Sequence, residues 1–308
     1  MNDSILVLGA GGFVGKHLTH ALVERGEKVI AASRHTATFQ ADGVESIVGQ
    51  FNEPEHFMPL LARSRAVVHV ASRSTPGSSA GNAIAELRDN LRPTLALLQA
   101  MQQTPQINLL YLSSGGSLYL AETEEPAEET SSVRPRSYHG AGKIAAEYFI
   151  SAWCDQSGGA ATILRPSNIY GPGQPERTGF GIVPTGFSKI SRDETLTVWG
   201  DGSAVRDYLY IADFAALCTA VLTVPMHPGM LVLNAASGRG VSLNELFTAM
   251  EEVAGHPLRR VYDYARAVDA PRVVMDASLA YRRYGWTSTI SLHEGLKKTW
   301  DWFSTTQR

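Results

Sequence analysis

The sequence predicts an α/β protein in which a doubly wound parallel sheet is followed by a smaller, mixed α/β domain. Short apolar runs alternate with amphipathic helical patterns as far as Arg165, which is typical of consecutive β-α-β units. The first run, Ile5 to Leu8, breaks into glycines just before a helical pattern begins. This break predicts a strand, a tight turn and a helix N-terminus at the start of the chain.

Three glycines follow the first strand at intervals of three residues, Gly9, Gly12 and Gly15. One glycine allows the tight turn, one lets a phosphate approach the backbone, and one lets the helix pack closely on the strand. The helix N-terminus at Phe13 and Val14 offers free N–H groups and a positive dipole end to an anion. We therefore expect a dinucleotide-binding loop here, and the alternative is an ordinary flexible turn.

The remaining elements are expected in order along the chain. Strands are predicted at 28–32, 46–48, 66–70, 109–113, 161–165, 196–199 and 231–234, and helices at 16–25, 55–62, 82–102, 138–156, 214–221, 243–253 and 291–303. Pro93 should bend the helix at 82–102 or mark a local break in it. The elements become shorter after about residue 170, so we place a dinucleotide-binding domain at 1–169, with 208–223 returning to it, and a substrate-binding domain at 170–308.

Composition narrows the class of partner. The chain has 308 residues, and its 27 Lys and Arg against 30 Asp and Glu give a formal net charge of -3, so we expect no nucleic-acid partner and no anionic membrane surface. No apolar run approaches the about 20 residues of a membrane span, and the first strand follows Met1 too closely for a signal peptide. Only two cysteines occur, Cys154 and Cys218, without metal-ligand spacing. We expect a cytoplasmic protein without a metal site.

The end of the second predicted strand bears on cofactor choice. An acidic residue at this place would bind the 2′-hydroxyl of the adenosine ribose, but this chain has Ser33 and Arg34. A hydroxyl and an arginine suit a 2′-phosphate, so NADP is possible, and the alternative is a solvated loop arginine. The polar loop from Ala71 and Ser72 to Gly81 follows another strand end. We interpret it as a flap over the nicotinamide or as a plain linker.

Several motifs occur in a fixed order along nearly the whole chain. They are GAGGFVG (9–15), HVAS (69–72), DNLRPTLALLQA (89–100), LSSGGSLY (112–119), GAGKIAAE (140–147), LRPSNIYGPG (164–173), GDGSAVRDYLYIADF (200–214) and APRVVMDAS (270–278) with YGW (284–286). Together they resemble the extended short-chain dehydrogenase/reductase family, in its NAD-dependent epimerase/dehydratase branch, typified by UDP-galactose 4-epimerase. The resemblance implies a Rossmann fold, bound NAD(P) and a nucleoside-diphosphate sugar substrate. It also implies a homodimer formed by the helices at 82–102 and 138–156.

The resemblance also assigns roles to single residues. Asn90 would support the catalytic helix beside the cofactor, and Asn168, Arg206 and Arg272 would hold the nucleotide and its diphosphate, for which the planar fork of arginine is suited. Family members use a tyrosine as the proton acceptor, a lysine four residues later that holds the nicotinamide ribose, and a serine or threonine that hydrogen-bonds the reacting oxygen. Lys143 matches the lysine.

The sequence departs from this pattern at two catalytic positions. The residue four before Lys143 is His139, and Tyr138 lies five before, which places it about 140° away from the lysine on a regular helix. The residue expected to be serine or threonine is Gly115, flanked by Ser114 and Ser117.

Three interpretations follow from these departures. His139 acts as the general base, an irregular helix start brings Tyr138 into the site, or the protein binds its ligands without catalysis. We expect 4-epimerisation of a nucleotide sugar through a transient 4-keto sugar, with a 4-keto-sugar reductase or a catalytically silent binding protein as alternatives. A dehydratase is less expected because Gly115 and Gly116 supply no carboxylate.

Overall fold

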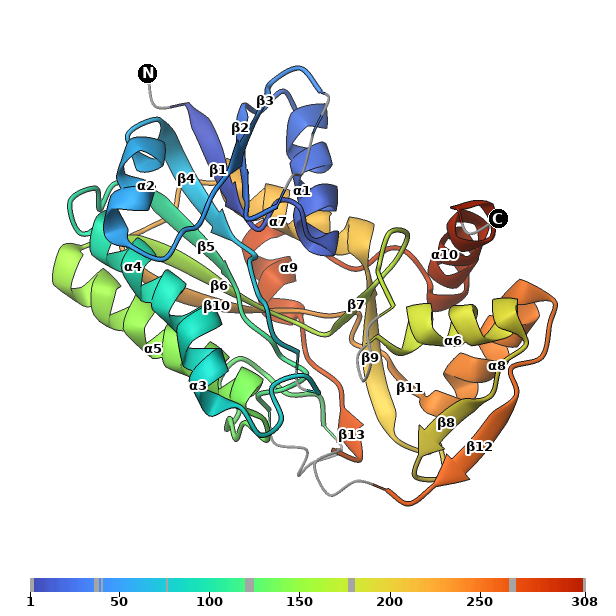
Figure 1. Cartoon of the computed structure of the whole chain (residues 1–308). Helices are drawn as coiled ribbons and strands as arrows, with labels where there is room; N and C mark the ends of the chain where they lie inside the picture. Colours follow the sequence, from blue (N-terminus) through green and yellow to red (C-terminus); the bar gives the residue numbers. More distant parts are fainter. Residues whose placement is uncertain are drawn as a thin grey trace. The chain divides into compact units, whose positions relative to one another are not determined.

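The computed structural model describes residues 3–35, 39, 41–75, 77–119, 125–176, 181–265 and 270–306 (Figure 1). The chain forms two compact units. Unit 1 consists of Met1–Ser114, Ser137–Arg165 and Ala215–Leu233, and unit 2 consists of Gly115–Arg136, Pro166–Phe214 and Asn234–Arg308.

Unit 1 is built around a seven-stranded sheet with the strand order β10-β6-β5-β4-β1-β2-β3. The strands are β1 (Ser4–Leu8), β2 (Val29–Ser33), β3 (Val44–Val48), β4 (Ser64–His69), β5 (Asn108–Leu112), β6 (Ala160–Pro166) and β10 (Gly229–Ala235). Each neighbouring pair from β3 to β6 is parallel. The order runs outward in both directions from β1, so the predicted doubly wound sheet is confirmed.

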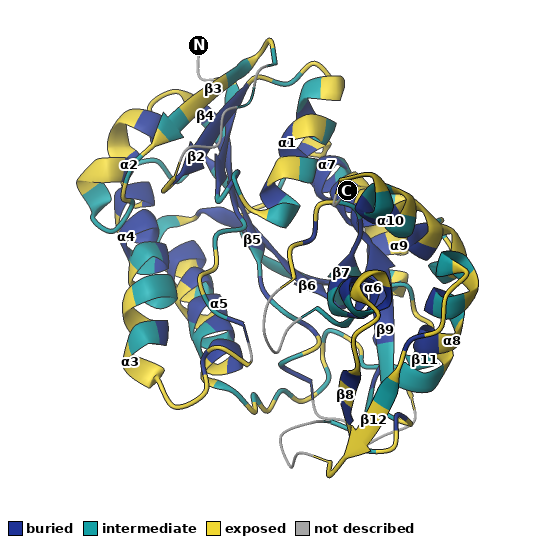
Figure 2. Cartoon of the chain, turned by 45° about the vertical axis from the view of Figure 1, so that its right-hand side comes forward, coloured by how far each residue is buried: buried dark blue, intermediate teal, exposed yellow. Residues whose placement is uncertain are grey.

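Helices cover both faces of this sheet. The helices α2 (Pro54–Leu61), α4 (Arg92–Met101) and α5 (Tyr138–Ser157) lie on one face, and α1 (Phe13–Glu24) and α7 (Ile211–Thr223) lie on the other (Figure 1). On the α2, α4 and α5 face, Leu6 and Leu8 belong to one buried cluster with Phe57, Leu97 and Ile150. Each such side chain contributes about 1.5–3 kcal/mol on burial. The central strands of this sheet are mostly buried, the edge strand β3 is largely exposed, and the helices expose their outer sides (Figure 2).

The predicted helix at 82–102 is interrupted, as its proline suggested. It consists of α3 (Ala83–Glu86), a π-helical turn η1 (Leu87–Leu91) and α4, which has Pro93 in its first turn. A proline is tolerated there because the first N–H groups of a helix have no intrahelical partner. The predicted local break is therefore confirmed, and π-turns of this kind are frequent at functional sites.

Unit 2 contains the mixed domain. Its strands β7 (Asn168–Tyr170), β9 (Val205–Tyr210), β11 (Gly240–Ser242) and β13 (Arg272–Val273) form a small sheet in which β11 is antiparallel and β7 and β13 are parallel to β9. A second, parallel pair consists of β8 (Leu196–Trp199) and β12 (Arg260–Asp263). The helices are α6 (Ile182–Arg192), α8 (Leu243–Ala254), α9 (Ser278–Tyr284) and α10 (Leu292–Thr306).

Asp213 and Trp286, two residues of the sequence motifs, form hydrogen bonds that hold the C-terminal part of unit 2 in place. The carboxylate of Asp213 accepts hydrogen bonds from the N–H and hydroxyl groups of Thr289 and from the N–H of Ile290, at 2.8–3.1 Å. The indole N–H of Trp286 donates to the carbonyl oxygen of Asp213 at 2.9 Å. These bonds fix the approach to α10, so the aspartate and the tryptophan of the motifs have structural roles.

The division into units differs from the predicted domains at the segment 115–136. We assigned it to the dinucleotide-binding domain, but it packs within unit 2, because Tyr119 donates to Asn234 Oδ1 at 2.7 Å and the Ala127 N–H donates to the Val274 carbonyl at 2.9 Å. The segment that rejoins unit 1 is 215–233, where we had predicted 208–223.

Candidate functional site

Close backbone packing requires glycine at two positions of the loop before α1. Gly9 has φ +90°, a region that disfavours side chains, and a Cβ on it would lie 2.7 Å from the backbone of Ala71. A Cβ on Gly15 would collide with the Gly9 carbonyl and lie 2.7 Å from Ala10 Cα. The N-cap of α1, Gly12, offers no side-chain hydrogen bond to the helix. The N-terminal N–H groups of α1 are therefore not capped by a side chain at Gly12, and a helix N-terminus of this kind can bind an anion.

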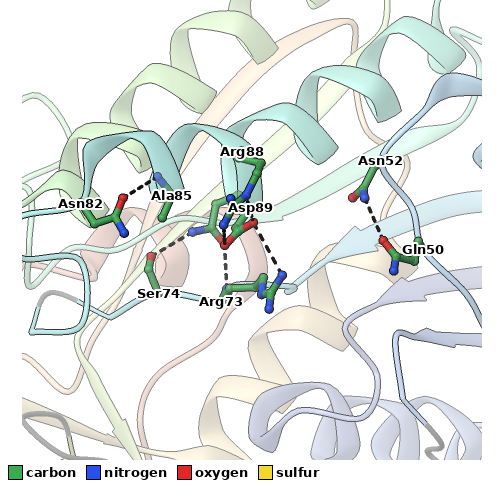
Figure 3. Close-up of polar contacts among 9 residues, drawn as sticks. Gln50, Asn52, Arg73, Ser74, Asn82, Ala85, Arg88 and Asp89 are labelled. Carbon is green, nitrogen blue, oxygen red and sulfur yellow. Dashed lines mark hydrogen bonds and ion pairs between the residues drawn. The ribbon is translucent and has the colours of Figure 1, made fainter.

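Arg34, at the end of β2, lies close enough to other charged side chains of unit 1 to interact with them. Desolvation and Arg73 lower the pKa of Arg34, and Asp89 raises it. Asp89 also pairs with Arg73 at 3.6 Å and with Arg88 at 2.8 Å (Figure 3). The neighbouring Ser33 hydroxyl donates to the carbonyl of His35. This arginine-rich group near the strand ends can attract an anion.

A chain of hydrogen bonds links the loop after β4 to α5. The Arg73 N–H donates to Asn90 Oδ1 at 2.7 Å, Asn90 Nδ2 donates to Ser74 Oγ at 2.9 Å, and Ser74 Oγ lies 2.9 Å from His139 Nδ1. The backbone N–H of His139 donates to Ser79 Oγ at 3.1 Å. The hydroxyl of Ser72 also donates to the Ser74 carbonyl at 3.1 Å. Asn90 thus supports the first turn of α5 through Ser74.

His139 is buried at the start of α5, whereas Tyr138 is 46% exposed. Desolvation, and then the charge of Lys143, lower the pKa of His139 to about 3. The helix begins regularly, with the Ser137 hydroxyl accepting from the Gly140 N–H at 3.1 Å. The structure therefore brings His139 next to Lys143 and gives no irregularity that would turn Tyr138 inward.

Lys143 is 5% exposed, and its Nζ donates to the carbonyl of Leu112, the last residue of β5, at 2.7 Å. Desolvation lowers its pKa to about 8, although Glu86 and Glu147 raise it. The ammonium also lies 4.9 Å from the ring centroid of Tyr111. Lys143 is therefore held at the carboxyl end of a sheet strand, where ligands of such folds bind.

Two buried acidic residues near Lys143 escaped the sequence analysis. Glu147 forms a bidentate ion pair with Arg165, with Nη2 2.6 Å from Oε2, and accepts from the Ser113 hydroxyl. Glu86 is 5% exposed and lies against Gly142, where a Cβ would be 2.6 Å from its Oε1. Glu147 stands one helical turn after Lys143, a spacing that could have flagged it.

The loop after β5 carries the second departure from the family pattern. Ser114 ends the first segment of unit 1, while Gly115 and Ser117 belong to unit 2. A Cβ on Gly115 would lie 2.7 Å from Met275 Cε, closer still to its sulfur, and 3.1 Å from the Pro166 carbonyl. Met275 is fully buried, so its thioether fills the space that a side chain at position 115 would need.

The residues expected to hold the nucleotide and its diphosphate lie together in unit 2. Asn168 is on β7, Arg206 on the neighbouring β9 and Arg272 on β13, which also pairs with β9. Asn168 Nδ2 donates to the Asp207 carbonyl at 2.9 Å, and Arg206 Nη1 donates to the Val205 carbonyl at 2.8 Å. One small sheet therefore positions all three side chains.

Within the described part of the chain, no three His, Cys, Asp or Glu residues gather as metal ligands. In the same residues, no helix has the length and apolar character needed to cross a membrane. The candidate site in unit 1 consists of a glycine-rich loop before α1, a buried lysine and a hydrogen-bonded histidine.

This combination defines a dinucleotide-binding protein of the extended short-chain dehydrogenase/reductase type. The chain belongs to the NAD dependent epimerase/dehydratase family, whose sequence profile matches residues 5–234.

The chain is similar over its whole length to nucleotide-sugar epimerases. A putative UDP-glucose 4-epimerase of Methanocaldococcus jannaschii is 26% identical, with 99% of each chain covered. A UDP-glucose 4-epimerase of Streptomyces lividans is 27% identical over 99% of this chain and 97% of the relative. The crystal structure of UDP-glucose 4-epimerase with UDP-glucose from Thermotoga maritima superposes with a TM-score of 0.92 at 27% identity, over 99% and 100% of the two chains. The structure of the Thermus thermophilus UDP-glucose 4-epimerase in complex with NAD superposes with a TM-score of 0.90 at 27% identity, and the match covers 98% of this chain and 99% of that chain.

Proposed function

We propose that this protein is an NAD(P)-dependent nucleotide-sugar 4-epimerase that works with an atypical pair of residues, His139 and Lys143. The observation that carries the proposal is the burial of both side chains on one turn of α5, with Lys143 Nζ bonded to the end of β5. Such a pair can hold a sugar hydroxyl and move its proton, while the bound dinucleotide supplies a reversible hydride acceptor.

The chain offers residues for each part of the ligands. The loop from Gly9 to Gly15 would hold the cofactor pyrophosphate, which is supported by its tight glycine turn before the N-terminus of α1, and Lys143 would hold the nicotinamide ribose. Arg34, near Arg73, supports a phosphorylated ribose, so we propose that NADP is accepted. Similar proteins bind UDP-glucose or act on UDP-sugars, which supports a uridine-diphosphate sugar held by unit 2. A cytoplasmic location stays a prediction.

We also propose a homodimer, because unit 1 exposes apolar side chains on two helical segments that contact each other. Ile84 of α3 is 71% exposed and Leu87 of η1 54%, and on α5 Tyr148 is 69% and Phe149 49% exposed. A surface of this kind is typical of a subunit interface.

Two alternatives rest on particular observations. The low pKa of His139 makes it a weak base, and Met275 closes the position of the missing hydroxyl, which together support a protein that binds without turnover. The arginines at the cofactor end support a 4-keto-sugar reductase.

One purified sample separates these possibilities. Part of it is denatured and the released dinucleotide is identified, and the rest is incubated with UDP-glucose, UDP-N-acetylglucosamine and their 4-epimers. We expect a C4 epimer without net change in NAD(P)H, abolished by His139→Ala and retained by the exposed control Tyr138→Phe. A tightly bound dinucleotide without turnover of any of these sugars would favour the binding protein, and stoichiometric consumption of NADPH with a 4-keto sugar would favour the reductase.

A further inference from the structure

The amide of Asn90 has a fixed orientation. Its Oδ1 lies 2.7 Å from the backbone nitrogen of Arg73, which can only donate. The reverse orientation would set an NH₂ group against this N–H, so the oxygen must face Arg73. The Nδ2 group therefore faces Ser74 and donates to its Oγ at 2.9 Å.

Ser74 is consequently an acceptor from Asn90 and still has its own hydroxyl proton to place. Among the residues that the structure describes, the acceptor recorded at this hydroxyl is His139 Nδ1, at 2.9 Å. Donation to Nδ1 gives this proton an acceptor, whereas the reverse bond, from an Nδ1–H to Ser74 Oγ, would leave the hydroxyl proton without an acceptor among the described residues. Since a neutral imidazole carries a single N–H, a histidine that accepts at Nδ1 must carry its proton at Nε2.

We infer that Ser74, oriented by Asn90, holds His139 in its Nε2–H tautomer, so that His139 donates a hydrogen bond to a ligand oxygen and does not act as the general base. The inference rests on the proposed function for the identity of that oxygen, the reacting oxygen of the sugar. Ser74 and Asn90 are positioning residues, because they act through the imidazole.

The surroundings of His139 agree with a neutral donor. The ring is 8% exposed, and no hydrogen bond from Nε2 to another described residue is recorded. Desolvation lowers the pKa of His139, and the charge of Lys143, one turn along α5, lowers it further. The resulting pKa of about 3 keeps the ring neutral at physiological pH. A neutral imidazole can stabilise a developing oxyanion by donation.

With this role, the residues of α5 would differ in function from those of the family pattern. Family members use a serine or threonine hydroxyl as the donor to the reacting oxygen, and this chain has Gly115 there. His139 would supply the missing donor, and Lys143 Nζ, fixed one turn along α5 by its hydrogen bond to the Leu112 carbonyl, would be the group left to take the hydroxyl proton. The tyrosine of the family then has no direct counterpart.

Nitrogen-15 NMR of histidine-labelled protein tests the tautomer without any activity measurement. The His139 signals are assigned by their loss in His139→Gln, and long-range couplings to the ring protons distinguish the protonated from the unprotonated nitrogen. At pH 7 we expect Nε2–H in the wild type, a loss of this single tautomer in Ser74→Ala, and no change in Ser79→Ala, a matched control whose hydroxyl accepts from the backbone N–H of His139 and not from its ring. An Nδ1–H or cationic ring in the wild type, or an unchanged tautomer in Ser74→Ala, overturns the inference.

A second arm tests donation to the ligand. His139→Gln retains an N–H donor but cannot take a proton near neutral pH, whereas His139→Ala retains neither property. We expect the glutamine variant to keep at least ten times the epimerisation rate of the alanine variant, and equal rates would show that His139 is not a donor. If the wild type shows the Nε2–H tautomer but turns over no nucleotide sugar, the proposed function fails while the assigned tautomer stands.

Discussion

The buried ion pair of Glu147 and Arg165 should make Glu147→Gln one of the most destabilising single substitutions in unit 1. The side chains of Arg165 and Glu147 are 7% and 3% exposed, and Arg165 donates from both Nε and Nη2, while the Ser113 hydroxyl adds a third donor. Glutamine keeps the shape but removes the carboxylate charge that faces the buried guanidinium. Breaking such a pair costs about 3–5 kcal/mol, out of a total stability of about 5–15 kcal/mol.

The surface pair Arg63 and Glu45 provides the control. Its Nη1–Oε2 distance is 3.0 Å, but the side chains are 47% and 52% exposed, so Glu45→Gln should cost roughly 0–1 kcal/mol. Urea denaturation of the wild type and both variants, analysed with a common m-value, gives the difference in the free energy of unfolding. Equal losses in the two variants would refute the reasoning from burial.

A double variant separates two contributions to the loss of stability, the cost of a buried unpaired charge and the lost attraction between Glu147 and Arg165. Replacing both members, by Glu147→Leu with Arg165→Met, leaves no uncompensated charge and should recover most of the stability that Glu147→Gln loses. If the double variant is less stable than Glu147→Gln, the ion pair itself is the dominant contribution.

Three further outcomes are expected. Gly15→Ala should abolish retention of the dinucleotide, because its Cβ meets the Gly9 carbonyl; cofactor released on denaturation measures this, and full retention would contradict the fit of the loop. His139 has a folded pKa of about 3 against 6.5 when unfolded, so the unfolded chain binds more protons between these values and stability falls as the pH drops through this window. His139→Gln should therefore lose less stability than the wild type between pH 6.5 and 4, as read from urea midpoints, and parallel losses would speak against a buried neutral ring. Tyr148→Glu combined with Phe149→Glu, which places charges on exposed apolar positions, should yield monomers in sedimentation experiments if this surface forms the dimer, and an unchanged mass would exclude it as the interface.

The parallel sheet could be predicted because its signals are local. Most strands of unit 1 are short apolar runs, and the break from Leu8 into the glycines before α1 marks the turn between the first strand and the first helix. Pro93 likewise predicted the interruption of the long helical pattern at 82–102. The family pattern placed His139 in the catalytic register, where the structure buries it beside Lys143.

The contacts that decide the chemistry could not be predicted, because they join residues far apart in the chain. Ser74 and His139 are separated by 65 positions, and nothing in the polar loop after β4 singles out this serine. The packing of Glu86 on Gly142 depends on the approach of α3 to α5. Short strands such as β7 and β13 carry too few residues for a periodic signal.

The methionine packed over Gly115 has a consequence for engineering position 115. A serine there would place its Cβ against the thioether of Met275, which is fully buried in a small cluster with Tyr119 and Ala236. Overpacking of this kind costs about 1–3 kcal/mol. The end of a methionine side chain is flexible, so the cost at this position is set by the room that the buried cluster leaves for another Met275 rotamer. A design that combines the serine with a smaller apolar residue at position 275 removes the contact altogether.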